Sequence, residues 1–137
     1  MKKLSLFLLA VLYPLCTWAV DVQKKMETYP SGKIKAVYSF YVQDGKMIPH
    51  GKYKEYFTQG TLLKKIRYKH GLLAGKATEY SSKGYKKWKG DYKKGIKVGK
   101  WLLRDENGNK KIKGYFDKQG YLKKIIRYQT NGKQKRE

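Results

Sequence analysis

Cysteine is almost absent from this sequence. Among 137 residues Cys16 is the only one, so the chain cannot build an intramolecular disulfide framework. Stability therefore has to come from backbone hydrogen bonds and side-chain packing. The one cysteine lies within an apolar N-terminal run, whose role is considered below.

Acidic residues and arginine are also scarce. Ten Asp and Glu stand against 33 Lys and Arg, which gives a formal net charge of +23. Only four of these cations are arginine, namely Arg67, Arg104, Arg127 and Arg136. The planar guanidinium of arginine donates paired hydrogen bonds to bases and phosphates, whereas the lysine ammonium is a mobile point charge. The composition favours a diffuse acidic partner or surface; an excess kept for solubility or set by genome composition is the alternative.

Residues that could carry catalysis are thinly spread. His50 and His70 lie beside hairpin glycines, where histidines are usually solvated, so no metal site is expected. Glu55 and Glu79 are 24 residues apart, which fits recurring strand-face or salt-bridge positions better than an acid/base pair. No phosphate-binding loop is found. We expect a protein that is not an enzyme and needs no cofactor.

Residues 1–19 have the pattern of a secretory signal. Two lysines precede an apolar run over 4–15, and cleavage is predicted after Ala19. The run is shorter than the roughly 20 residues needed to span a membrane. Cys16 would leave with the signal; acylation of Cys16 is disfavoured because the three residues before it are not small. We expect an exported protein, periplasmic or secreted, and leave peripheral membrane association open.

Glycines recur at intervals of 24 residues from the middle of the chain onward. The series are Gly51, Gly75 and Gly99; Gly60, Gly84, Gly108 and Gly132; and Gly71 and Gly95. A fixed period of about 20 to 50 residues indicates repeated supersecondary units that stack on their neighbours. After Gly108 the next turn glycine, Gly120, follows only twelve residues later, so the second half of the unit is used twice.

The same pattern divides the chain into segments. After the signal we predict a linker over 20–28, a repeat domain over 29–132 and a basic tail over 133–137. Asp44-Gly45 is a typical hairpin turn within the repeat domain.

Alternation along the strand after each turn glycine predicts two faces. Positions two, four, six and eight after the glycine form the expected packed face: Leu62, Lys64, Ile66, Tyr68, Lys86, Trp88, Gly90, Tyr92, Lys110, Ile112, Gly114, Phe116, Leu122, Lys124, Ile126 and Tyr128. Positions three, five and seven lie opposite, and eight of these twelve residues are basic. Those eight are the predicted anion-binding residues: Lys65, Arg67, Lys87, Lys89, Lys111, Lys113, Lys123 and Arg127.

In stacked hairpins these cations would recur every second strand, about 10 Å apart. Such a row suits a polyanion or an anionic bilayer surface. The alternative is a solvated face, on which lysines keep a one-sided sheet soluble and block edge pairing.

The pattern Gly-x-aromatic-x-x-Tyr, then a turn glycine, a tyrosine and Gly-x-x-x-Gly, as in residues 51–75, resembles the MORN repeat. It is similar in particular to the variant in bacterial YwqK-like proteins, a group labelled as antitoxins. The resemblance covers about residues 29–132, while Ala77 departs from it in an aromatic position and Arg104 in a tyrosine position. The matching repeat positions are Gly51, Tyr53, Tyr56, Gly60, Tyr68, Gly71, Gly75, Tyr80, Gly84, Tyr92, Gly95, Gly99, Trp101, Gly108, Phe116, Gly120, Tyr128 and Gly132.

This resemblance implies an all-β fold: an elongated, twisted antiparallel sheet of stacked β-hairpins with a period of 24 residues. It also implies binding to membranes, acidic phospholipids or partner proteins. The sequence thus predicts a module that binds an anionic envelope or membrane surface through its basic face. The alternative is a protein-interaction module, such as a toxin-neutralising protein, that uses exposed aromatic residues and sheet edges. Nucleic acid is an unlikely partner for an exported chain, although the charge would permit it.

Two structural questions stay open at this point. The sequence does not set an oligomeric state. It also leaves open what covers the apolar side of a single sheet: curling of the sheet, lysine stems or a partner.

Overall fold

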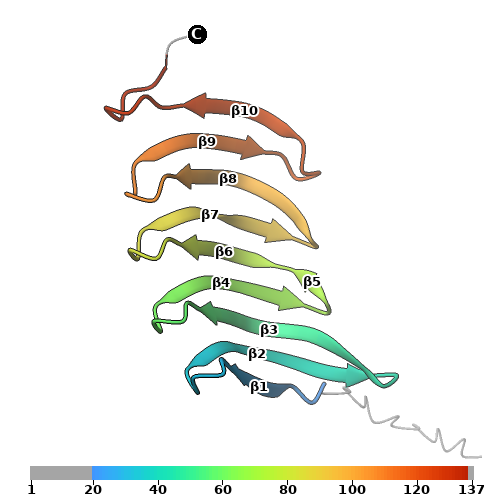
Figure 1. The fold of residues 1–137 in the computed structure, drawn as a ribbon. Coiled ribbons are helices and arrows are strands. Elements are labelled where there is room, and N and C mark those ends of the chain that lie inside the picture. Colours follow the sequence, from blue (N-terminus) through green and yellow to red (C-terminus); the bar gives the residue numbers. More distant parts are fainter. Residues whose placement is uncertain (1–19, 136–137) are drawn as a thin grey trace, which may run out of the picture.

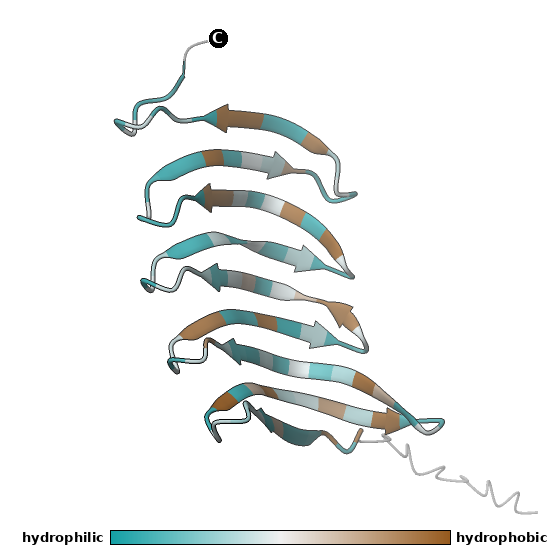
Figure 2. Ribbon diagram, in the orientation of Figure 1, coloured by the Kyte–Doolittle hydropathy of each residue, from teal (hydrophilic) through white to brown (hydrophobic). Residues whose placement is uncertain are grey.

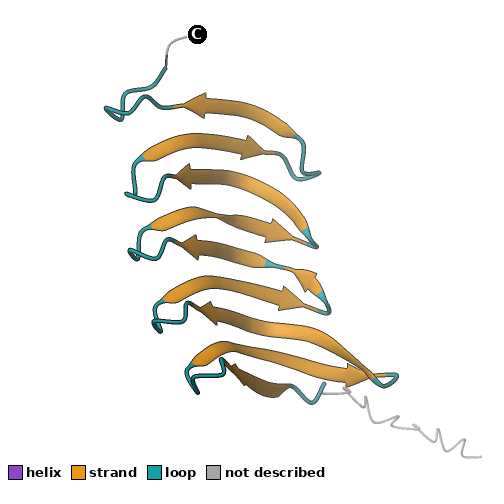
Figure 3. Ribbon diagram, in the orientation of Figure 1, coloured by secondary structure: helices purple, strands orange, loops and turns teal. Residues whose placement is uncertain are grey.

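The computed structural model describes residues 20–135. Within this range ten strands form one open antiparallel sheet, and no helix is present (Figures 1 and 3). The strands are β1 (Gln23–Thr28), β2 (Ile34–Gln43), β3 (Lys46–Tyr56), β4 (Leu62–Lys69), β5 (Leu72–Leu73), β6 (Gly75–Tyr80), β7 (Lys86–Lys93), β8 (Ile96–Arg104), β9 (Lys110–Phe116) and β10 (Leu122–Arg127). Strands follow one another in sequence order, except that the short β5 lies off this path and pairs with β4, which also pairs with β6. The all-β antiparallel fold expected from the sequence is confirmed.

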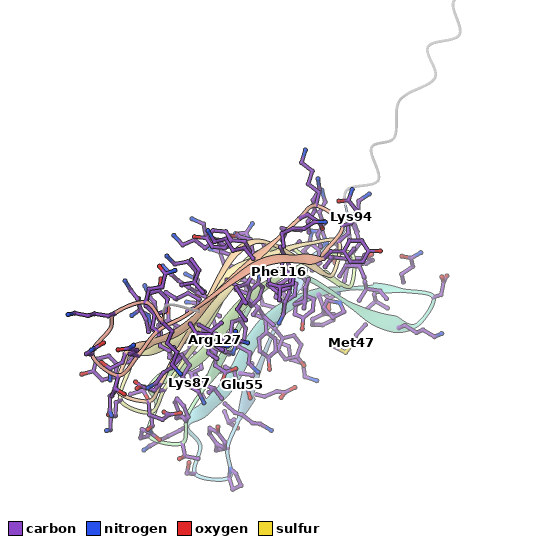
Figure 4. All side chains as sticks on the ribbon, turned by 90° about the horizontal axis from the view of Figure 1, so that it is seen from above. Met47, Glu55, Lys87, Lys94, Phe116 and Arg127 are labelled. Carbon is purple, nitrogen blue, oxygen red and sulfur yellow. The ribbon has the colours of Figure 1, made fainter. Side chains whose placement is uncertain are left out.

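Two-residue turns join the strands at one end of the stack. They lie at Asp44-Gly45, His70-Gly71 and Lys94-Gly95, and every one of these residues has φ between 48° and 82°. Positive φ at both central positions defines the type I′ turn, whose twist matches that of the flanking strands. The hairpin expected at Asp44-Gly45 is confirmed. Figure 4 shows Met47 and Lys94 near this end of the strands and Lys87 near the other.

Longer turns join the strands at the opposite end. In the turn between β3 and β4, the Phe57 amide donates to the Thr61 carbonyl and the Gly60 amide donates to the Phe57 carbonyl, both at 2.8 Å. The same pair of bonds recurs at Gly32, Gly84, Gly108 and Gly132. It also recurs at Gly120, but that turn joins β9 to β10 and lies at the end of the two-residue turns, beside Ile96 (Figure 1). Five of these turns are followed by a β-bulge, in which the outgoing strand carries one extra residue. The extra residues are Lys35, Leu63, Lys87, Lys111 and Lys123.

Asp105 stabilises one of these turns through its side chain. Its carboxylate accepts hydrogen bonds from the backbone amides of Asn107 (3.0 Å) and Asn109 (2.9 Å) and lies 3.3 Å from the Lys111 ammonium. Partial burial alone would raise the pKa of Asp105, but the hydrogen bonds from Asn109, Lys111 and Asn107 outweigh it and lower the pKa from 3.8 to about 2.

A pH dependence of stability follows. Because the folded state holds the pKa of Asp105 at about 2, below its value of 3.8, this carboxylate stabilises the fold above pH 3.8 and loses that contribution as pH falls through about 2. Asp105→Asn should therefore unfold at a lower temperature than wild type at neutral pH, and the difference should close below about pH 2. Thermal unfolding at a series of pH values measures this. A difference that is constant over the series would contradict it.

The sheet begins earlier than the sequence predicts. Residues 20–28 were expected to form a linker, but β1 occupies most of this range and pairs with β2, with Met26 opposite Val37. That prediction was wrong because β1 is an exposed edge strand, and lysines at an edge give it no apolar alternation to detect. At the other end, the Lys135 amide donates to the Arg127 carbonyl at 2.9 Å, so the start of the predicted tail pairs back onto β10.

The predicted signal over 1–19, with Cys16, and the last two residues of the tail lie outside the described residues. Between residues 20 and 135 the structure contains no helix that is long and apolar enough to cross a membrane.

Residues directly opposite each other in neighbouring antiparallel strands point to the same side of the sheet. On one side, Tyr38 faces Tyr53, which faces Ile66; further along, Trp101 faces Gly114, which faces Ile125. We call this side the aromatic face; it also carries Tyr68, Trp88, Tyr92, Ile112, Phe116 and Leu122. Figure 2 shows that hydrophobic and hydrophilic residues are mixed along the strands, as a sheet with two unlike faces requires.

Trp101 forms the centre of the aromatic face. Its side chain stacks on Trp88 with ring centroids 5.6 Å apart and meets Tyr92 and Phe116 edge-on at 5.0 and 6.4 Å. The ring lies over Gly90, where a Cβ atom would overlap its Cδ2 and Cε2 atoms. The sheet has only one layer (Figure 4). Trp101 is nevertheless buried, because its neighbours on the same face surround it.

Candidate anion-binding face

The side opposite the aromatic face is dominated by lysine, and we call it the lysine face. One row of directly opposite residues runs along β2, β3 and β4 as Val37, Lys54 and Lys65, and along β7 to β10 as Lys89, Leu102, Lys113 and Ile126. A parallel row contains the pair Lys52 and Arg67, the pair Lys76 and Asp91, and the run Lys100, Tyr115 and Lys124. Every strand of the path from β3 to β10 thus contributes a cation to this face.

Two lysine series with a 24-residue interval build these rows. They are Lys52, Lys76, Lys100 and Lys124, and Lys65, Lys89 and Lys113. Members of one series lie on alternate strands, which places them about 10 Å apart. The two series interleave, so cations occupy successive strands, about 5 Å apart, rather than every second one as expected.

Several of these cations face each other directly. Lys54 lies opposite Lys65, and Lys52 lies opposite Arg67. Like charges in directly opposite positions destabilise a sheet. Folding alone therefore gives no reason for this arrangement.

The rows also lack acidic partners. Within residues 20–135 no carboxylate lies within 4.0 Å of the ammonium groups of Lys52, Lys65, Lys76, Lys89 or Lys100. All five side chains are exposed. Among the described residues of the two rows, Asp91 is the one carboxylate, and it lies opposite Lys76. The lysine face thus presents an electrostatic potential that its own side chains do not neutralise.

Two shallow grooves run across the lysine face. The first has a volume of about 360 Å³ and is lined by Lys52, Lys65, Arg67 and Lys76, with Ile66 and Gly75. The second has a volume of about 420 Å³ and is lined by Lys76, Lys86, Lys89 and Lys100, with Ala77, Thr78, Gly90 and Asp91. Lys76 borders both, so the two grooves are neighbours.

Four of the eight predicted anion-binding residues lie on this face: Lys65, Arg67, Lys89 and Lys113. Three others, Lys87, Lys111 and Lys123, are the extra residues of β-bulges and do not continue its rows. Each pairs with a turn carboxylate: Lys87 with Glu106 at 3.0 Å, Lys111 with Asp105 at 3.3 Å, and Lys123 with Asp117 at 3.1 Å. Their predicted place in the row was wrong because simple alternation does not allow for a bulge.

Arg127 lies on the other face. It is opposite Ile112, and its neighbour Ile125 is opposite Gly114, so both belong to the aromatic face. Tyr128, predicted for the packed face, instead has its ring 5.8 Å from the Lys113 ammonium on the lysine face. The faces of β10 are exchanged because the bulged turn at Gly120 follows Phe116, which lies on the aromatic face and pairs with Leu122. The earlier bulged turns follow residues of the lysine face, namely Tyr56, Tyr80 and Arg104.

The same shift affects residues just after other turns. Lys86 and Lys110 were predicted on the packed face, but Lys86 lines a groove with Lys89, and the Lys110 ammonium lies 5.9 Å from the Tyr128 ring. Sequence reasoning also missed Lys52, Lys54, Lys76, Lys100 and Lys124. The 24-residue recurrence of four of them was the signal that could have found them.

Carboxylates on the aromatic face are paired. Glu55 and Glu79 share the Lys64 ammonium at 3.7 and 4.0 Å, which confirms their predicted salt-bridge role. The Tyr53 hydroxyl donates to Glu55 at 3.2 Å, and burial together with this carboxylate raises the pKa of Tyr53 to about 12.

His50 and His70 meet each other and Tyr41. The two imidazole centroids lie 4.8 Å apart, the His70 amide donates to Nδ1 of His50 at 3.3 Å, and the Tyr41 hydroxyl lies 3.2 Å from Nδ1 of His70. Across the part of the chain that the structure describes, no group of three His, Cys, Asp or Glu could hold a metal ion.

Comparisons with protein-family models, with curated proteins and with solved structures found no match to this chain. The assignment of a site therefore rests on the geometry described above.

Proposed function

We propose that this protein is an exported, non-enzymatic β-repeat module that binds an anionic envelope or membrane surface through its lysine face. The observation that carries the proposal is the double row of lysines, five of them exposed and with no carboxylate within 4.0 Å among the described residues, in which Lys54 and Lys65 lie directly opposite each other. An arrangement that costs folding stability fits a surface whose like charges are neutralised by a ligand.

The energetics are sufficient for membrane binding. A lysine near an anionic membrane surface contributes about 1 kcal/mol. Five such side chains, at Lys52, Lys65, Lys76, Lys89 and Lys100, are exposed on one face of the sheet and can approach a surface together. Their flexible ammonium groups suit a diffuse target of phosphate or carboxylate groups rather than one defined ligand.

The sequence pattern supports the same proposal. The glycine and aromatic spacing resembles the MORN repeat, whose members are associated with membranes and acidic phospholipids. The predicted signal would bring the lysine face into contact with the cell envelope. A protein partner is the alternative function, and it is favoured by apolar side chains exposed on the aromatic face, among them Leu122 at 50%.

Co-sedimentation with vesicles tests the proposal. The chain from residue 20 onward should bind vesicles that contain anionic phospholipid at low ionic strength, and should not bind neutral vesicles. Binding should weaken steeply as salt is raised, because exposed charges are screened over about 8 to 10 Å near physiological ionic strength. Soluble polyphosphate should compete if phosphate groups are the ligand chemistry. Absence of binding to both vesicle types at low salt would exclude the membrane function.

A further inference from the structure

The aromatic face carries an uncovered apolar patch on its C-terminal half. The patch consists of Leu103, Ile112, Leu122 and Ile125 around Trp88, and Leu103, Leu122 and Ile125 are 40%, 50% and 36% exposed. It surrounds a depression of about 430 Å³ that is also lined by Trp101 and Phe116. All described strands belong to one sheet, so no second layer of residues 20–135 covers it. A sheet with one apolar face normally packs against another layer.

Charge is distributed unevenly along the same face. Its N-terminal half carries Glu27, Glu55 and Glu79 in one row on β1, β3 and β6, with Lys64 on β4 between the last two and paired with both. From β7 to β10 the corresponding row contains Trp88, Leu103, Ile112 and Arg127, and no carboxylate. Nearby, the Lys97 ammonium lies 4.7 Å from the Trp101 ring. One half of the face is therefore rich in tyrosine and holds all three carboxylates of the row, and the other is apolar and basic.

We propose that the aromatic face is a self-association surface, on which a second copy of this chain packs in reversed strand order. A two-fold axis parallel to the strands, close to β6, would place the tyrosine-rich half of each copy over the apolar half of the other, with Glu27 of one copy over Arg127 of the other. Such an interface is isologous and closes at the dimer. Tyr38, Tyr53 and Tyr68 of one copy would then cover the apolar patch of the other.

The size of the face is adequate for a stable dimer. With nine strands on the main path, the sheet is about 40 Å long at about 4.8 Å per strand, and its strands are about 20 Å long, which gives roughly 800 Å² per copy. That corresponds to about 1,600 Å² in total, the area of a standard stable interface. Two sheets pack face to face at about 10 Å, which leaves room for interdigitating tyrosine and leucine side chains.

Sedimentation analysis over a range of protein concentrations tests the dimer. Wild type should change from monomer to dimer as concentration rises, and Leu122→Glu should weaken association at least tenfold because it buries a charge in the interface. Leu72→Glu is the matched control, because Leu72 is 51% exposed and lies opposite Lys69 on the lysine face. It should dimerise like wild type. A wild type that stays monomeric, or equal losses in the two variants, would overturn the proposal.

Cysteine cross-linking tests the strand order, since the chain from residue 20 onward contains no cysteine of its own. Lys25 and Ile125 lie at opposite ends of the central row of the aromatic face. A mixture of Lys25→Cys and Ile125→Cys chains should form disulfide-linked heterodimers on oxidation, and neither chain should cross-link to itself. Self-linked dimers without heterodimers would overturn the reversed order. Neither measurement involves an anionic ligand, so either result is independent of the function proposed above.

Discussion

Gly90→Ala is expected to destabilise the protein by about 3 kcal/mol, the upper end of the cost of overpacking a core with one methyl group. The added Cβ would overlap ring atoms of Trp101, and that ring is held by Trp88 on one side and by Tyr92 and Phe116 at its edges. Relief of the overlap requires Trp101 to leave its buried position. Urea unfolding monitored by tryptophan fluorescence measures the change.

Gly114→Ala is the matched control for this substitution. Gly114 lies on the other side of Trp101 in the same row, and its φ is also outside the positive region. A Cβ there would meet the ends of the Leu122 and Phe116 side chains at 3.3 Å, and Leu122 is half exposed and can move. We expect a loss below about 1 kcal/mol. Equal losses for the two variants would show that the Trp101 ring shifts freely and that Gly90 does not hold it in place.

The sequence was sufficient to predict the class of the fold. Glycine at fixed intervals marks turns, and Asp44-Gly45 specifies a two-residue hairpin on its own. The β-bulges could not be predicted in the same way, because the amino-acid type of an extra residue such as Lys87 does not distinguish it from a regular strand residue. A single bulge reverses the face of every residue that follows until the next irregularity. Counting from the turn glycine placed Ile66 and Trp88 correctly, because their bulged turns lie at the same end of the sheet. It failed at Tyr128, because the bulged turn at Gly120 lies at the other end.

The candidate site was predictable in part for a related reason. Lys65, Lys89 and Lys113 each follow a turn glycine at the same distance in the sequence, so the glycine spacing predicts their positions. Lys76 and Lys100 lie on the intervening strands, so their place beside the first series depends on pairing between strands that sequence alone does not reveal. The ion pairs of Lys87 and Lys111 depend on carboxylates in turns and are equally a product of the fold.

The reversed dimer and the lysine face are compatible in one molecule. Packing through the aromatic faces would turn both lysine faces outward, in opposite directions. The dimer would then be bivalent, but its two lysine faces could not both contact one flat surface, so a gain in apparent affinity requires two surfaces. Two separate vesicles could satisfy this condition, and bridging between them would appear as turbidity.

Loss of three lysines from one groove is expected to weaken binding to anionic vesicles about 100-fold. Lys76, Lys89 and Lys100 line the same groove and are exposed, and at about 1 kcal/mol each their removal costs about 3 kcal/mol of binding free energy. The variant with all three changed to Gln should fold at least as stably as wild type, because the change relieves repulsion on a face with excess positive charge. Vesicle co-sedimentation and thermal unfolding measure the two effects separately.

A charge-matched control separates the lysine face from net charge. Changing Lys87, Lys111 and Lys123 to Gln removes the same three charges, but these lysines are bulge residues that pair with Glu106, Asp105 and Asp117. This control should lose less than about fivefold in affinity, because its lysines already have acidic partners. If both variants lose affinity equally, binding depends on total charge alone and the rows have no special role. If the control loses more, the surface in contact with the vesicle is the turn edge of the sheet.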